Sequence, residues 1–340
     1  VFNGVVNAGD RVTISPAGLE ARVRGIQIQG KPAQRAAAGQ RCALNLSGSG
    51  LAALGRGDWA LAPALHRPTQ RIDARITALA AEQQALRHWM PVHLHLATAD
   101  VTARLAIRRG ASVALGASAL VQIVLDKPVV ALHGDRFILR DQSASRTLGG
   151  GVVLDPFAPA VRRASAARLA VLAALEQPTP QDALAALAAQ AQGGIDLAHF
   201  ETAFNLLPER AAQMYTQAGI VQLGREQRSG ITATRHTALR EAALDHLRAF
   251  HRAQPQAAGC EIEAVRAALA PELAADTFLA LLRGLADERR LEIGGSAARL
   301  PGHNLTANSA DEKLWQAVQP ALLAAGFNAP PLRELAAQLK

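Results

Sequence analysis

The chain has 340 residues and a formal net charge of +8, with 49% hydrophobic and 4% aromatic residues. This length is sufficient for two or three domains with separate cores. No uninterrupted apolar run approaches the roughly 18 residues of a membrane span, which argues against an integral membrane protein. The two cysteines, Cys42 and Cys260, are not needed as a bridge in a chain of this size, which favours a reducing, cytoplasmic location.

The excess positive charge lies in the first half of the chain. Residues 1–158 contain 18 Lys and Arg against 10 Asp and Glu, whereas residues 159–340 contain 18 of each. Because a basic surface attracts polyanions, this distribution favours nucleic-acid binding by the first half.

Alternating apolar and polar residues predict β-strands throughout the first half. Turn residues divide it into two small β-domains, residues 1–64 and 65–158. The strands expected in the first domain are 11–15, 21–29 and 41–46. Those expected in the second are 71–79, 91–97, 102–107, 118–125, 129–131, 136–140 and 149–155. We expect Trp59 and Trp89 in a core or a domain contact.

After Pro156 the pattern becomes helical, with short β-prone pieces at 220–223, 230–233, 291–293 and 298–300. The expected helices are 164–175, 180–191, 196–204, 208–218, 238–253, 260–270, 274–288 and 312–325. Three helices followed by a two-stranded ribbon is the order of a winged helix. The pattern therefore predicts winged helices at 159–234 and 235–304, and the start of a further one at 305–340.

Three motifs carry a resemblance to a known family. Residues 7–12 (NAGDRV) and 38–46 (AGQRCALNL) resemble the second domain of translational GTPases. Residues 92–101 (VHLHLATADV) resemble the third domain of selenocysteine-specific elongation factors. Residues 134–156 (GDRFILRDQSASRTLGGGVVLDP) resemble the third-domain signature shared with elongation factor Tu. The resemblance implies two translation-factor β-barrels followed by tandem winged helices, and a protein that delivers selenocysteyl-tRNA to the ribosome at recoded UGA codons.

The chain also departs from the full family pattern. It contains no GxxxxGK[ST] loop, so we expect GTP and its Mg²⁺ to bind a preceding domain and no cofactor or enzymatic activity in this chain. The family's last winged helix, which binds the SECIS hairpin of the mRNA, should follow Lys340. Both ends of the chain look cut, and we expect a fragment of a longer protein.

Arg41 is the candidate selenocysteyl-binding residue. In the family, a basic residue of the second-domain pocket matches this position. A guanidinium there would favour the selenolate anion over the neutral hydroxyl of serine by roughly 2–5 kcal/mol. The alternative is that Arg41 is an ordinary surface arginine on a strand.

The candidate tRNA contacts follow from the equivalent stretch of elongation factor Tu, which lies along the T-stem. Arginine binds phosphate through its forked donors, and glycine allows a close approach of the backbone. Arg136, Ile138 and Arg140 should share one strand face. The alternative is a barrel strand and its return turn kept for folding. The predicted tRNA-binding residues are Arg140, Arg146, Thr147, Gly149 and Gly150.

A metal site and DNA binding are the two alternatives to tRNA binding. His93 and His95 share a strand face and could begin a zinc site with Asp100 and His133, but two histidines lack the remaining ligands, and we predict no metal. A winged-helix DNA-binding regulator with a β sensor domain is the alternative function. A DNA reader should concentrate positive charge on its recognition helices, whereas the helical half is neutral.

Overall fold

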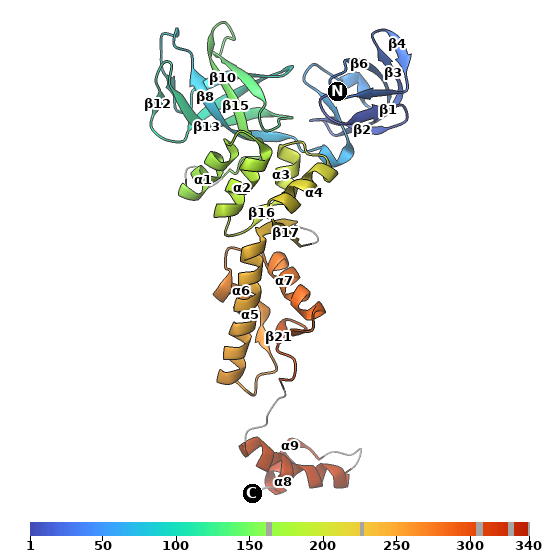
Figure 1. Cartoon of the computed structure of the whole chain (residues 1–340), viewed down its shortest axis with the longest axis vertical. Helices are drawn as coiled ribbons and strands as arrows, with labels where there is room; N and C mark the ends of the chain where they lie inside the picture. The colour runs from blue at the N-terminus through green and yellow to red at the C-terminus, as the bar shows by residue number, and fades with distance from the viewer. Residues whose placement is uncertain (161–164, 225–227, 304–308, 326–329, 339–340) are drawn as a thin grey trace. The chain divides into compact units, whose positions relative to one another are not determined.

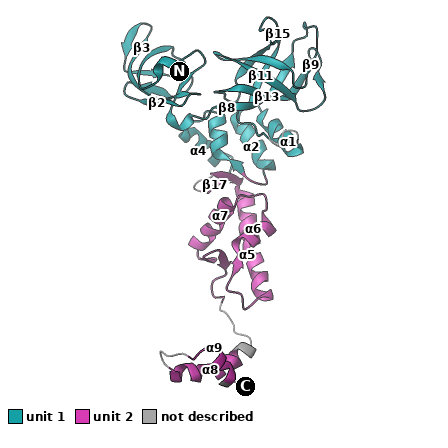
Figure 2. Ribbon diagram, turned by 180° about the vertical axis from the view of Figure 1, so that it is seen from behind, with its two compact units in different colours: residues 1–191, 195–221 teal, residues 192–194, 222–340 magenta. Residues whose placement is uncertain are grey.

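The structure is a computed structural model that describes residues 1–160, 165–224, 228–303, 309–325 and 330–338. The chain forms two compact units (Figure 2). Unit 1 comprises residues 1–191 and 195–221, and unit 2 comprises residues 192–194 and 222–340. Strands dominate the first half and helices the second (Figure 1), which confirms the predicted mixed fold class. Within the described residues no helix is long and apolar enough to cross a membrane.

The first β-domain has one small core between two sheets. β3 pairs with β2, β4 and β6, while β1 pairs with β5 in a separate two-stranded sheet. Ile14, Val23 and Ile26 are buried between them, and each such side chain contributes about 1.5–3 kcal/mol. The strands are β1 Val5–Asn7, β2 Arg11–Ser15, β3 Leu19–Ile28, β4 Lys31–Ala33, β5 Arg35–Ala37, β6 Cys42–Ser47 and β7 Trp59–Leu61.

The second β-domain is a closed barrel in the order β10-β11-β13-β8-β15-β14, with β14 pairing back to β10. Inward residues such as Ile72, Leu94 and Leu139 are fully buried and form the largest core of the chain. The barrel strands are β8 Thr69–Ala78, β10 Pro91–Leu96, β11 Ala99–Ile107, β13 Ser118–Val129, β14 Arg136–Arg140 and β15 Thr147–Asp155. A ribbon of β9 Leu86–Arg87 and β12 Ser112–Val113 extends from it.

One prediction in this domain is wrong. The separate strand at 129–131 does not form, because β13 continues to Val129 after an irregularity in its pairing with β8 beyond Val124. Of the two places predicted for Trp89, the core is excluded, because the residue is 45% exposed with a φ of +66°. Trp59 is half-buried and packs against Phe2, with ring centroids 4.6 Å apart.

Three glycines let β15 approach its neighbours. A Cβ atom would lie 2.4 Å from the Thr77 carbonyl oxygen at Gly149, and 2.7 Å from that of Phe137 at Gly150. At Gly151 it would lie 2.2 Å from the Arg75 carbonyl oxygen and 2.8 Å from the Phe137 ring. These separations are too short for any side chain, so the glycines are required by barrel packing.

Four helices of unit 1 follow the barrel, and each lies at one of the four predicted helical segments between 164 and 218. They are α1 Ala166–Leu175, α2 Pro180–Gln190, α3 Leu197–Ala203 and α4 Pro208–Gln217. Ser165, Thr179 and Asp196 cap the first three by accepting a hydrogen bond from a first-turn N–H. Apolar faces pack around a core that includes Leu172, Phe200 and Tyr215. Three short strands lie among and after these helices. β16 Ile195–Asp196 lies in unit 1, β17 Ile220–Leu223 spans the boundary between the units, and β18 Ser229–Thr232 lies in unit 2.

A buried charge cluster attaches these helices to the barrel. Arg168 of α1 donates to Asp73 of β8 at 2.6 Å and to Asp155 of β15 at 2.6 Å. Arg108 also donates to Asp73, and His199 of α3 hydrogen-bonds Asp155 at 2.9 Å. The carboxylates are almost fully buried. We call these five residues the barrel–helix cluster.

Burial by itself would raise the pKa of Asp155. The hydrogen bond from His199 and the charges of His199 and Arg168 outweigh it and hold the pKa well below its ordinary value. The folded state therefore favours the ionised carboxylate.

Unit 2 contains a winged helix in the order helix, strand, helix, helix, strand, strand. α5 Ala233–Ala253 follows its cap Thr232 and begins five residues before the predicted start at 238. The other elements are β19 Cys260–Glu261, α6 Ile262–Leu269, α7 Ala275–Asp287, β20 Glu292–Gly294 and β21 Ala297–Arg299. β21 pairs with both β19 and β20, and Leu247, Phe278 and Leu281 are fully buried in the core.

Two further helices are described in unit 2, α8 Ser309–Ala325 and α9 Leu332–Gln338. Residues 304–308, 326–329 and 339–340 lie outside the described residues. The further winged helix predicted at 305–340 therefore stays a prediction.

Replacement of Gly151 by alanine should destabilise the barrel by about 1–3 kcal/mol or more, because the new Cβ would overlap the Arg75 carbonyl. Thermal unfolding of the full chain measures the effect. Gly25→Ala in β3 is the matched control, since a Cβ there meets nothing within 4 Å. Equal changes in the two variants would contradict the packing explanation.

Replacement of Arg168 by methionine should lower the free energy of unfolding by about 3–5 kcal/mol, because two buried carboxylates lose their shared partner. Urea unfolding at pH 7 measures the loss, with Arg210→Met as the control at an exposed arginine of α4.

The same cluster predicts a pH dependence. Because the pKa of Asp155 is depressed in the folded state, its contribution is present above its unfolded pKa of about 3.9 and is lost as the pH falls further. When the pH is lowered below about 4, the urea concentration at the unfolding midpoint should decrease in the unchanged chain. It should decrease less in Arg168→Met. Parallel pH profiles of the two would argue against this cluster as the source.

Candidate functional site

The outer face of β14 presents two arginines to solvent. Arg136 and Ile138 are exposed and Arg140 is half-buried, while Phe137 and Leu139 point into the barrel core. The prediction that Arg136, Ile138 and Arg140 share one face is confirmed. This face is continuous with β10, because Arg140 lies opposite His93 and Ile138 lies opposite His95.

The turn after β14 is organised around the Asp141 carboxylate. It accepts hydrogen bonds from the backbone N–H groups of Ser145 at 2.7 Å and Arg146 at 3.0 Å. The Ser143 and Ser145 hydroxyls also donate to it. The N–H of Arg146 makes the largest contribution in holding the pKa of Asp141 well below its ordinary value, and the Ser145 N–H adds to it. The turn therefore holds Arg146 and Thr147 in a fixed backbone conformation.

Arg146 is exposed but already has two acidic partners. Its guanidinium lies 3.2 Å from Glu82 and 3.4 Å from Asp141. Its side chain is 52% exposed, so these ion pairs are solvated and weak. A phosphate could replace either carboxylate on the open side of the guanidinium.

Gly149 and Gly150 allow a close approach of neighbouring barrel strands, whereas a close approach of tRNA was expected from the sequence. β15 lies between β14 and β8, and both glycines pair with residues of each neighbour. The strand ladders therefore use their backbone groups, and the close approach that requires glycine is made to the barrel itself. Contact of these two residues with tRNA stays a prediction.

The two histidines of β10 lie beside the Asp100 carboxylate. His93 hydrogen-bonds Asp100 at 2.9 Å and His95 lies 3.8 Å from it. The hydrogen bond from His93 is the largest of several effects that lower the pKa of Asp100. His133 instead hydrogen-bonds the Leu154 carbonyl at 2.8 Å and stacks on Phe204. Among the described residues no group of three or more His, Cys, Asp or Glu is placed to hold a metal.

Arg41 lies immediately before β6 and is exposed. The next residues alternate, so that Cys42 and Leu44 line a pocket of about 460 Å³ while Arg41 does not. Its role in binding a selenocysteyl group stays a prediction.

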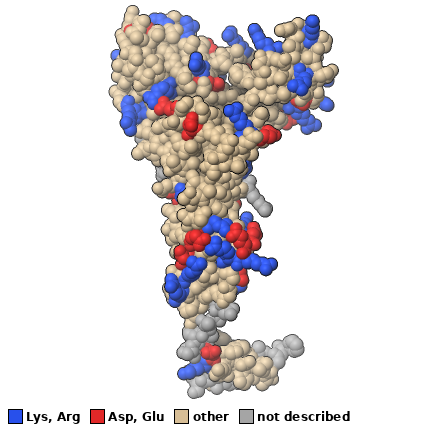
Figure 3. All heavy atoms as spheres, in the orientation of Figure 1, with Lys and Arg blue, Asp and Glu red and all other residues tan. Residues whose placement is uncertain are grey.

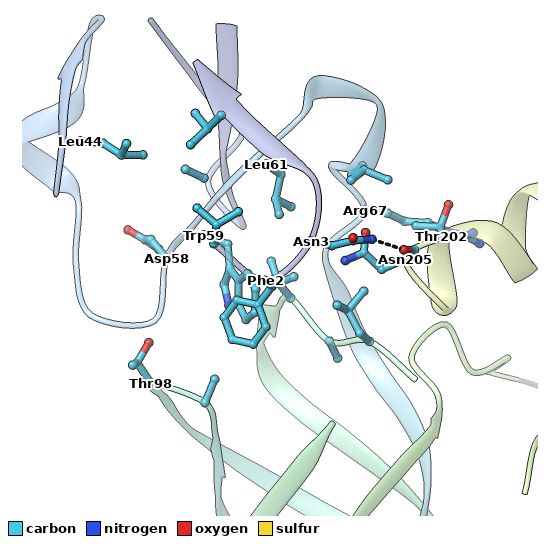
Figure 4. A pocket seen from close by; sticks show the side chains of 18 of the residues that line it. Phe2, Asn3, Leu44, Asp58, Trp59, Leu61, Arg67, Thr98, Thr202 and Asn205 are labelled. Carbon is cyan, nitrogen blue, oxygen red and sulfur yellow. Dashed lines mark hydrogen bonds between the residues drawn. The ribbon is translucent and has the colours of Figure 1, made fainter. Parts of the chain in front are cut away.

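The pocket beside Cys42 and Leu44 is mainly apolar and aromatic (Figure 4). Asn3 and Asn205 are joined across one side of it by a hydrogen bond of 2.6 Å from the Asn3 amide to the Asn205 carbonyl. Arg67 also lines the pocket, with its guanidinium 3.9 Å from the centre of the Phe157 ring. Sequence patterns did not indicate this pocket, since its lining residues come from segments far apart in the chain.

Several charged residues of unit 2 form ion pairs, and Figure 3 shows basic and acidic groups side by side over it. α7, the third helix of the winged helix, has Asp276, Arg283 and Asp287 as its charged residues. Ion pairs around it join Arg240 to Glu288, Arg290 to Glu241 and Arg299 to Glu292. This helix does not concentrate positive charge as a DNA-reading helix would.

A closed barrel with outward arginines, preceded by a second β-domain and followed by a winged helix, defines a chain of the translation elongation factor class. Two family models match it. Residues 73–160 match the selenocysteine-specific elongation factor β-barrel domain, and residues 244–300 match the winged helix of elongation factor SelB. Both matched segments are therefore similar to domains of selenocysteine-specific elongation factors.

Individual relatives from two bacteria carry the same family name as the two matching models. The selenocysteine-specific elongation factors of Desulfomicrobium baculatum and Escherichia coli K12 are 26% and 28% identical to it over 97% and 94% of the chain. These matches cover 52% and 50% of the two relatives, so the chain spans about half their length. A crystal structure of a bacterial selenocysteine-specific elongation factor, EF-Sec, shares the fold with a TM-score of 0.62 and 18% identity, over 98% of this chain and 51% of that one.

Proposed function

We propose that this chain binds selenocysteyl-tRNA as part of a selenocysteine-specific elongation factor that delivers it to the ribosome at recoded UGA codons. The observation that carries the proposal is the family's own β-barrel, at residues 73–160, with Arg136 and Arg140 on its outer face. Guanidinium groups on a strand face suit a phosphate backbone because each can donate two parallel hydrogen bonds.

Arg140 is the central contact of the proposed tRNA surface. Its side chain is half-buried and no described residue forms an ion pair with it, so no carboxylate competes with phosphate for its guanidinium. Arg146 and Thr147 lie beside it, because Arg140 pairs with Thr147 across the β14–β15 hairpin. Gly149 and Gly150 contribute by allowing the hairpin to pack, and Arg146 would exchange Glu82 or Asp141 for phosphate.

The remaining activities of such a factor are assigned to other parts of the protein. The sequence contains no GxxxxGK[ST] loop, so GTP and Mg²⁺ are proposed to bind elsewhere and this chain to act without hydrolysing nucleotide. Recognition of a SECIS hairpin is likewise proposed for a part beyond this chain. Contact with the ribosome places its work in the cytoplasm. Arg41 is proposed to favour the selenolate of the aminoacyl group.

The proposal predicts that Arg140→Ala weakens binding of selenocysteyl-tRNA. Loss of one phosphate contact should reduce affinity about three- to tenfold and lower the salt dependence of log K by about 1. The measurement is a titration of the full chain with selenocysteyl-tRNA, seryl-tRNA of the same body and duplex DNA, at low and moderate salt. Arg248→Ala is the control, since this exposed α5 arginine pairs locally with Asp245.

Arg41→Ala in the same titration tests the discrimination separately. It should abolish any preference for selenocysteyl-tRNA over seryl-tRNA and leave binding of the tRNA body unchanged. Tighter binding to DNA than to tRNA would overturn the proposed function and favour the winged-helix regulator.

A further inference from the structure

A second pocket of about 520 Å³ lies between the barrel and α1. Its residues come from α1, β8, β13 and the segment between β11 and β13. β15 alone separates β8 from β14, and Arg75 lies in register with Val152, which lies in register with Arg136. Pockets of roughly 300–1,000 Å³ commonly hold small ligands. Its polar lining residues are Arg75, Arg108, Arg109, Ser112, Ser118 and Glu176.

The lining carries more positive than negative charge, with three guanidinium groups against one carboxylate. Arg108 is buried and belongs to the barrel–helix cluster, where Asp73 neutralises it. Arg75 donates to both oxygens of Glu176, at 2.5 and 2.6 Å. Arg109 is exposed, and no described residue forms an ion pair with it. Because Asp73 and Glu176 balance Arg108 and Arg75, the unbalanced charge of the lining is that of Arg109.

The Arg75–Glu176 pair is open to competition. The side chains are 38% and 28% exposed, so water reaches both and the pair contributes little to stability. Glu176 is the last cap residue of α1, whereas the buried cluster fixes the first turn of α1 through Arg168. An anion could displace Glu176 from Arg75 without detaching α1.

The rest of the pocket suits the remainder of a small ligand. Ser112 and Ser118 are exposed and can donate from their hydroxyls. Val113, Leu169 and Ala173 provide an apolar wall. A concave site of this volume admits a small molecule more readily than the backbone of a folded RNA, whose phosphates lie on a convex surface.

We propose that this pocket binds a small phosphorylated ligand, with Arg75 and Arg109 holding its phosphate and Glu176 as the competing carboxylate. Guanidinium groups bind phosphate through paired N–H donors, and two of them at one site add geometric selection. This inference does not depend on the proposed function.

Isothermal titration of the full chain with inorganic pyrophosphate at low salt tests the site. Arg109→Ala should weaken binding at least tenfold, because it removes one of two phosphate ligands without touching a folded-state contact. Glu176→Gln should tighten binding several-fold, because it removes the competing negative charge. Arg24→Ala, an exposed arginine of β3, is the matched control and should leave the affinity unchanged.

Opposite changes in Arg109→Ala and Glu176→Gln are specific to this pocket. The proposal is overturned if pyrophosphate does not bind, if Arg24→Ala and Arg109→Ala weaken binding equally, or if Glu176→Gln fails to tighten it. The same variants are also titrated with a single-stranded RNA decamer. Dependence on Arg109 for the RNA but not for pyrophosphate would also overturn the proposal, since the site would then belong to an RNA surface.

Discussion

The attachment of the first helices to the barrel depends on one buried ionic contact, Arg168 between Asp73 and Asp155. Two carboxylates buried where the helices cover the barrel would be strongly unfavourable alone, and one guanidinium with several donors satisfies both. Arg108 and His199 complete the cluster. Because ionic hydrogen bonds are directional where apolar packing is not, this contact sets the angle at which α1 and α3 meet the barrel.

The two ends of α1 are held by different physics. Its first turn is bound by buried charges, whereas its last residue is bound by a solvated ion pair from Glu176 to Arg75. A related contrast separates two arginines of the proposed tRNA surface. No described residue forms an ion pair with Arg140, whereas Arg146 shares its charge with Glu82 and Asp141. Phosphate must therefore displace a carboxylate to bind Arg146, but not to bind Arg140.

Sequence patterns predicted what depends on neighbours along the chain. The ranges of β2 and β14 are the predicted ones, because strict alternation and flanking turn residues mark both strands. The start of α5 was missed because its first turn is polar and only the Thr232 cap marks it. The barrel–helix cluster was missed because Asp73 and Arg168 are 95 residues apart. β8 alternates as TQRIDARITA, with Asp73 at a polar position between Arg71 and Arg75, so its sequence gives no sign that Asp73 is buried.

The glycine run that helped to identify the family is required by carbonyl oxygens of its own barrel, at distances no side chain tolerates. A motif of this kind reports how closely three strands pack, and any protein with the same strand spacing would need it. It is therefore a marker of ancestry and architecture, and it gives no information about the ligand. Ligand preference must be read from residues that packing leaves free to vary, such as Arg136 and Arg140 on the exposed side of the neighbouring strand.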